Sequence, residues 1–166
     1  MTLATVQQFQ RAHDLLDSNR NDEAAAALEA LTNAAPAFAL APLNLGILRA
    51  RQGQWPQAQA SLNEAVKRDP ALTSAYAELG VVNRNLGQFA DASSAYGHAL
   101  EIDADNAKVH RNLGVLLDLY LGKPSEALDH YQRALALGGG ADKQMASWIA
   151  EVQSRLNGER KTAKVQ

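Results

Sequence analysis

Hydrophobic and small residues recur along the chain at a fixed interval. The same interval separates Leu45 from Leu79 and Leu79 from Leu113. Each recurrence contains a Leu-Gly pair followed by a separate Gly, an Ala and a bulky apolar residue, between polar positions. The columns that return at this interval are Leu45, Leu79 and Leu113; Gly46, Gly80 and Gly114; Ala24, Ala58 and Ala92; and Pro36 and Pro70. A period of this length predicts a chain of repeated structural units rather than one globular core.

Two kinds of glycine alternate within each repeat. Gly53 and Gly87 fall where one helix must stop and turn, a position that favours a left-handed residue. The Gly after Leu lies inside a predicted helix, where it costs about 1 kcal/mol relative to Ala. We therefore expect the backbone of a neighbouring helix to approach closely at Gly46, Gly80 and Gly114.

These columns resemble the tetratricopeptide repeat, a helix-turn-helix unit of about 34 residues. The best match is 73–106; it contains Tyr76, Leu79, Gly80, Gly87, Phe89, Ala92, Tyr96 and Ala99. The repeat at 107–140 contains one inserted residue near Gly122. The repeat at 5–38 has no Gly at either glycine position. The resemblance implies an all-α, right-handed α-solenoid of about four repeats, at 5–38, 39–72, 73–106 and 107–140.

The end of the chain continues the same plan. After the glycines at 138–140, apolar residues recur at helical spacing on one side of 141–157, and the other side is polar. This pattern predicts a capping helix, so that a single domain spans 1–157. The last residues, 158–166, have no apolar face, and we expect them to be disordered. At the other end Leu3, Val6 and Phe9 form an apolar edge with no cap before it.

Composition and charge exclude several classes of protein. The chain is 46% hydrophobic, 5% aromatic and 20% charged, with a net charge of −2. This balance argues against a nucleic-acid binder or a membrane-surface binder. No cysteine is present, so neither a disulfide framework nor a thiolate metal site is possible. We expect no insertion into a membrane by this chain. Its compartment is open: cytoplasmic if the chain is full length, periplasmic or lipid-anchored if an export signal was removed.

No combination of residues predicts catalysis. The four histidines, His13, His98, His110 and His130, are scattered without the i, i+4 spacing of a zinc site. The sequence contains no nucleophile elbow, phosphate-binding loop or dinucleotide fingerprint. We therefore expect no metal, no cofactor and no enzymatic activity.

A binding surface is predicted from the first helix of each repeat. At 100° per residue, four repeat positions face away from the partner helix, and in tetratricopeptide proteins that side lines a concave groove. The candidate groove residues, with their flanking cations, are Gln10, His13, Asn44, Ile47, Arg51, Glu78, Val81, Arg84, Asn85, Lys108, Arg111, Asn112 and Val115. Asn and Gln side chains can pair with peptide groups, and Ile47, Val81 and Val115 have no other reason to be apolar there.

The resemblance implies a protein-protein interaction module that binds a partner peptide or helix. Bacterial proteins of this type serve in assembly, pilus or secretion systems. Lys108, Arg111 and Asn112 resemble one end of the carboxylate clamp of heat-shock co-chaperones, but Phe9 and His13 stand where the clamp requires Lys and Asn. We therefore do not expect this chain to bind peptides as the carboxylate clamp does. Two alternatives remain: a self-associating structural protein, forming a homodimer through the first helix, and a non-catalytic subunit of an enzyme complex.

Overall fold

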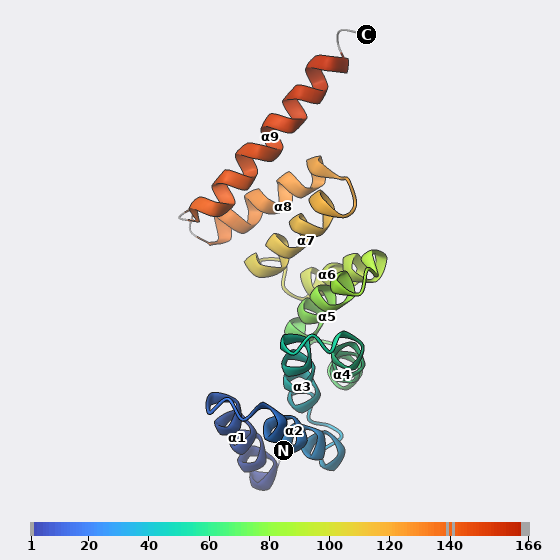
Figure 1. Cartoon of the computed structure of the whole chain (residues 1–166), viewed down its shortest axis with the longest axis vertical. Helices are drawn as coiled ribbons and strands as arrows, with labels where there is room; N and C mark the ends of the chain where they lie inside the picture. Colours follow the sequence, from blue (N-terminus) through green and yellow to red (C-terminus); the bar gives the residue numbers. More distant parts are fainter. Residues whose placement is uncertain (1, 139, 141, 164–166) are drawn as a thin grey trace. The chain divides into compact units, whose positions relative to one another are not determined.

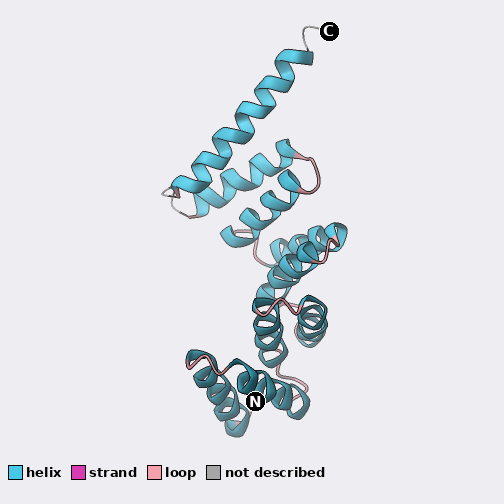
Figure 2. Cartoon of the chain, viewed as in Figure 1, coloured by secondary structure: helices cyan, strands magenta, loops and turns pink. Residues whose placement is uncertain are grey.

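The computed structural model describes residues 2–138, 140 and 142–163, and these residues fold into nine α-helices joined by short connections (Figure 1). The helices are α1 (Leu3–Asp17), α2 (Asn21–Ala34), α3 (Leu40–Arg51), α4 (Trp55–Arg68), α5 (Thr73–Asn85), α6 (Phe89–Ile102), α7 (Ala107–Leu119), α8 (Pro124–Leu137) and α9 (Lys143–Ala163). No strand occurs among the described residues (Figure 2). The predicted all-α class is confirmed.

The helices fall into two compact units, Met1–Gly87 with α1 to α5 and Gln88–Gln166 with α6 to α9. Within the first compact unit each helix packs on the next along the chain, and the same holds within the second. Successive packing of helix pairs is the arrangement of an α-solenoid, as the period of the sequence predicts. A single domain over 1–157 stays a prediction.

The turns inside the repeats depend on left-handed residues. Gly53, Gly87 and Gly122 have φ values of 73°, 74° and 63°, so the predicted role of the turn glycines is confirmed. In the first repeat, Asn19 stands at the position of Gly53 and adopts φ 56°. Asn is the residue that tolerates this conformation best after Gly, which explains how a repeat without glycine still turns.

The glycine inside α3 has a different role, and it differs in detail from the prediction. A β-carbon placed on Gly46 would lie 2.6 Å from Cγ of Leu62 and 3.2 Å from the backbone oxygen of Ala58. The closest obstacle is therefore the side chain of Leu62 on α4, and the backbone of α4 lies farther away. The expected reason, close packing of a neighbouring helix, is confirmed in this modified form.

The repeated apolar columns form the core. Ala24, Ala58, Ala92 and Ala127 are completely buried, each in the second helix of its repeat. One turn later the same helices bury a larger residue; this column consists of Leu28, Leu62, Tyr96 and Tyr131. Small residues let the two helices of a repeat approach, and the larger ones fill the space between them.

The C-terminal elements show one agreement and one difference. The residue inserted in the fourth repeat lies in the turn between α7 and α8, at 120–123, as predicted. The capping helix begins at Lys143 and extends to Ala163, so residues 158–163, expected to be disordered, are helical. Met145 and Val152 are 2% exposed, in keeping with the predicted apolar side of the cap. Residues 164–166 of the expected tail lie outside the described residues.

Among the described helices, none is both long enough and apolar enough to cross a membrane.

Candidate functional site

The predicted groove residues of the first compact unit lie on three first helices, α1, α3 and α5. Each of them is exposed or half-buried, and none belongs to the core. They are Gln10 and His13 on α1, Asn44, Ile47 and Arg51 on α3, and Glu78, Val81, Arg84 and Asn85 on α5. The prediction that these positions face away from the core therefore agrees with their exposure, and their role in binding stays a prediction.

The amide groups of this row bond within their own helices. Nδ2 of Asn44 donates to the carbonyl oxygen of Leu40 at 2.8 Å, and Nδ2 of Asn85 donates to that of Val81 at 2.8 Å. The carboxamide oxygen of Asn44 accepts no hydrogen bond from the described residues. An amide held by its own helix keeps a fixed orientation, so Asn44 presents a positioned acceptor for an N–H group.

Apolar and cationic side chains accompany the amides on α3. Ile47 is half-buried, one turn from Asn44. Arg51 is exposed at the end of the helix and forms no ion pair with a described residue. The α3 face thus combines an acceptor, an apolar contact and a cation that is available to a carboxylate.

An aromatic cluster joins this surface at the first repeat. The ring of Phe9 lies edge-on to His13, with centroids 4.6 Å apart, and edge-on to Phe38 at 5.0 Å. His13 is a predicted groove residue and Phe9 stands in the flanking column of Arg111, but Phe38 lies in the connection between α2 and α3 and was not predicted. Periodicity within helices contains no information on a residue in a connection, so only the structure could reveal it.

On α7, in the second compact unit, the predicted residues are partly engaged by the capping helix. The guanidinium of Arg111 lies 5.1 Å from the ring centre of Trp148 on α9, and its Nη2 donates to Oε1 of Gln144 at 3.4 Å. Val115 lines a hollow of about 220 Å³ together with Trp148 and Val152. Asn112 is half-buried and Lys108 is exposed. Arg111 is therefore held at a cation–π contact and would have to leave it to meet a ligand.

An ion pair fixes the same corner. Asp118 on α7 pairs with Arg155 on α9, and the Asp118 side chain is only 9% exposed. Burial and the carboxylate of Asp118 raise the pKa of the neighbouring Tyr131 to about 12. These contacts were not predicted, because the capping helix was recognised only by its apolar stripe.

Two histidines that are distant in sequence meet between α7 and α8. Nδ1 of His110 lies 2.8 Å from Nδ1 of His130, and Nε2 of His110 lies 3.0 Å from the carbonyl oxygen of Ala104. Burial lowers the pKa of His130, and the positive charge of His110 lowers it further. No group of three or more metal-ligating side chains occurs among the described residues, so this pair lacks the further ligands of a zinc site.

Family models match most of the chain. Two models of the tetratricopeptide repeat match, one over residues 9–71 and the other over residues 71–138. No curated protein sequence matches the chain. Together the two models extend from the first repeat to the fourth, in agreement with the repeats predicted from the period of the sequence.

Solved structures share the fold. The crystal structure of MamA protein has 21% identity and a TM-score of 0.77, and the match covers 99% of this chain and 96% of that chain. YrrB, described as a TPR protein with an unusual peptide-binding site, has 21% identity and a TM-score of 0.75, with coverage of 89% and 75%. The first TPR of Spaghetti bound to an HSP90 peptide has 21% identity and a TM-score of 0.68, with coverage of 72% and 93%. Identities of this size show the fold alone.

Proposed function

This chain belongs to the tetratricopeptide repeat family, and we propose that it binds a peptide segment of a partner protein along the first helices of its repeats. The fold supports a protein-protein interaction scaffold, because stacked helix pairs present an extended surface of side chains that the core does not use. The finer proposal concerns which surface binds the partner and which type of peptide it binds.

The observation that carries the proposal is the mixed character of the α3 face. Asn44 presents a fixed acceptor, Ile47 is an incompletely buried apolar side chain, and Arg51 is a cation without an ion pair among the described residues. A peptide backbone can donate an N–H group to Asn44. The side chains of the peptide can place an apolar group against Ile47 and a carboxylate against Arg51. We therefore propose a partly apolar, acidic peptide as the ligand of the first compact unit.

The corresponding face of α5 extends this surface within the first compact unit. Val81 is half-buried like Ile47, and Glu78 stands in the column of Asn44. The aromatic rings of Phe9 and His13 add an apolar contact on α1. A ligand lying across α1, α3 and α5 would thus meet an apolar side chain or ring on every first helix.

The solved relatives support a peptide as the type of ligand, since Spaghetti is bound to an HSP90 peptide and YrrB is described with a peptide-binding site. This chain departs from the carboxylate clamp at Phe9 and His13. We therefore do not propose the same peptide. The proposal includes no catalytic role, no nucleic acid and no cofactor. A role in a bacterial assembly or secretion pathway rests only on analogy with other repeat proteins.

One observation favours self-association as a second candidate. Leu3 and Val6 on α1 are 74% and 43% exposed, which is high for apolar side chains on a helix of a folded unit. A homodimer through the first helix would cover them. A non-catalytic subunit of an enzyme complex is a form of the same binding role.

The test is selection of peptides from a random-sequence display library on the immobilised chain, followed by affinity measurement with synthetic peptides. The variant Asn44→Ala/Ile47→Asp/Arg51→Glu should lose the selected peptides. The matched control, Asn63→Ala/Lys67→Glu, changes exposed residues of the second helix α4 and should retain them. Equal binding by both variants would place recognition elsewhere on the chain.

A further inference from the structure

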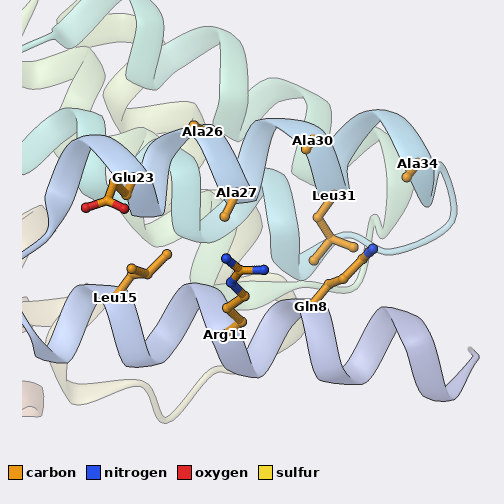
Figure 3. Close-up of a pocket in the computed structure, with 9 residues that line it drawn as sticks. All are labelled: Gln8, Arg11, Leu15, Glu23, Ala26, Ala27, Ala30, Leu31 and Ala34. Atoms are coloured by element: carbon orange, nitrogen blue, oxygen red, sulfur yellow. The ribbon is translucent and has the colours of Figure 1, made fainter.

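A groove with an apolar lining lies between the first two helices, and none of its residues takes part in the proposed function. It encloses about 510 Å³. Figure 3 shows that α1 and α2 contribute side chains from its two sides. The residues that matter here are Arg11 and Leu15 on α1, and Ala27, Ala30, Leu31 and Ala34 on α2.

The second repeat shows what fills such a groove. The positions one repeat later lie on α3 and α4, and there α2 packs against α3 and is hydrogen-bonded to Arg68 of α4. Leu28 of α2 lies in one buried cluster with Leu45, and Glu29 of α2 pairs with Arg49. Arg68 of α4 donates to the carbonyl oxygen of Thr32, near the end of α2, at 3.0 Å. The groove of the first repeat therefore corresponds to the place that a helix occupies in the second.

The chemistry of the two places is different. The four polar residues Arg49, Ser61, Glu64 and Arg68 correspond to Leu15, Ala27, Ala30 and Ala34 of the first repeat. The apolar Leu45 corresponds to Arg11. The polar contacts that hold α2 in the second repeat thus have no equivalent in the groove of the first. Instead the lining of the groove is mainly apolar, with Gln8 and Glu23 as its other polar residues, and it has a cation, Arg11, where the second repeat is apolar.

No hydrogen bond or ion pair to a described residue fixes the position of Arg11. It is exposed, and it acts on Glu23 only through its charge: the hydrogen bond from Arg20 lowers the pKa of that carboxyl most, and the charge of Arg11 lowers it further. Its side chain extends from α1 toward α2, into the groove (Figure 3). The nearby carboxylate of Glu23 is already bonded to Arg20, with Nε to Oε1 at 2.7 Å. A guanidinium beside an apolar surface forms its strongest hydrogen bonds with a carboxylate, which here the ligand would supply.

We infer that this groove is a docking site for an amphipathic helix of a partner protein, which contacts the alanines with a stripe of apolar side chains and pairs an Asp or Glu with Arg11. The acidic residue takes the position that Leu28 has in α2. The residue that follows it is apolar, because Leu15 replaces the Arg49 to which Glu29 binds.

A second copy of this chain does not supply that helix. The residues in the column of Leu28 are Leu62, Tyr96 and Tyr131. A second helix of another copy, docked as α2 docks on α3 and α4, would place an apolar side chain against Arg11. The groove therefore selects a helix with an acidic residue at this point, which none of the four second helices offers.

The experiment uses hydrocarbon-stapled peptides, because a free helix of about 14 residues is only marginally stable in water. The acidic probe has the sequence of residues 21–34 with Leu28→Glu and Glu29→Leu, and the comparison probe has the unchanged sequence. Fluorescence anisotropy with the full chain should show binding of the acidic probe. Arg11→Glu should weaken that binding about tenfold or more, because an attractive pair becomes a repulsive one. A probe with Leu28→Lys and Glu29→Leu should bind this variant and restore the affinity.

Two control variants accompany the measurement. Arg51→Glu changes an exposed cation of the proposed peptide surface on α3 and should leave probe binding unchanged, so failure of the proposed function and failure of this inference can be told apart. Ala30→Arg should abolish binding by filling the groove, with circular dichroism unchanged. Absence of binding by the acidic probe, equal binding by the unchanged probe, or no effect of Arg11→Glu would overturn the inference. Dimers that Ala30→Arg dissociates would overturn it in favour of a second copy.

Discussion

The ring of Tyr131 on α8 occupies the space directly beside Gly114 on α7. A β-carbon placed on Gly114 would lie 2.6 Å from both Cδ1 and Cε1 of Tyr131. Tyr131 is 2% exposed, so its ring cannot turn out into solvent without opening the repeat. The glycine of the fourth repeat is therefore required by the size of its neighbour, as Gly46 is required by Leu62.

Gly114→Ala should lower the free energy of unfolding by about 1–3 kcal/mol, the usual cost of overpacking a core. The matched control is Gly97→Ala in α6, where an added β-carbon meets no atom within 4 Å. There the substitution should raise the free energy of unfolding by up to about 1 kcal/mol, because Ala favours a helix more than Gly does. Urea denaturation of both variants measures the difference. Equal effects would show that Tyr131 yields to the extra methyl group.

The sequence predicted the repeats well because each column has one physical requirement. Gly53 needs a left-handed backbone, and Ala58 needs to be small, so both recur at a fixed interval wherever the fold recurs. Asn19 shows the limit of this reasoning, since a different residue meets the same requirement and the glycine column is interrupted there. The structure identifies Asn19 as the turn residue of the first repeat, because its φ is 56°.

The candidate site was less predictable, since side chains from different helices meet there without a fixed spacing. His110 and His130 lie on different helices and belong to two columns, yet their rings are in contact. Arg111 is a predicted groove residue that the structure shows half-buried, because its contact with Trp148 depends on how α9 packs. Exposure follows from periodicity within one helix, whereas contacts between helices depend on their packing.

The pH dependence of stability should reflect His130. Its pKa in the folded chain lies below the unfolded value of 6.5, because burial and the charge of His110 disfavour the protonated ring. The unfolded chain therefore binds the proton more readily, so the stabilisation is present above pH 6.5 and is lost as the pH falls below it. Glu126 and Asp129 act in the opposite direction and limit the shift.

Urea denaturation between pH 8 and pH 5 measures this effect. His130→Gln should flatten the decline in the free energy of unfolding below pH 6.5. His98→Gln is the matched control, since His98 is exposed and contacts Glu101 within its own helix at 3.1 Å. It should leave the decline unchanged. An identical pH profile for the parent and His130→Gln would assign the dependence to other groups.

The capping helix should contribute to the stability of the second compact unit. Val152 on α9 is 2% exposed, whereas its neighbour Gln153 is exposed. Val152→Asp places a charge in an apolar contact, and we expect a loss of about 2–4 kcal/mol with increased aggregation. Gln153→Asp should change the free energy of unfolding by no more than about 0.5 kcal/mol. Thermal unfolding with light scattering distinguishes the two, and equal melting temperatures would mean that α9 does not stabilise the fold.

Arg68 should connect two repeats of the first compact unit. Its guanidinium donates to the carbonyl oxygens of Thr32 at 3.0 Å and Ala35 at 3.2 Å, and its Nε bonds to Glu64 at 2.8 Å. The side chain is 10% exposed, so water does not readily replace these bonds. Arg68→Ala should therefore cost about 1.5–3 kcal/mol, the range for hydrogen bonds that involve a charged group.

Comparison with the adjacent Lys67→Ala isolates this effect, because Lys67 is exposed on the same turn of α4. The lysine variant should unfold with nearly the midpoint of the parent in urea. Hydrogen exchange should locate the loss in the arginine variant: amides at the end of α2 should exchange faster, since Arg68 holds the carbonyl groups at that end. Faster exchange confined to α4 would instead show that Arg68 stabilises only its own helix through Glu64. In that case the replacement of Arg68 by Ala34 at the same position of the first repeat would not remove any polar contact to a neighbouring helix.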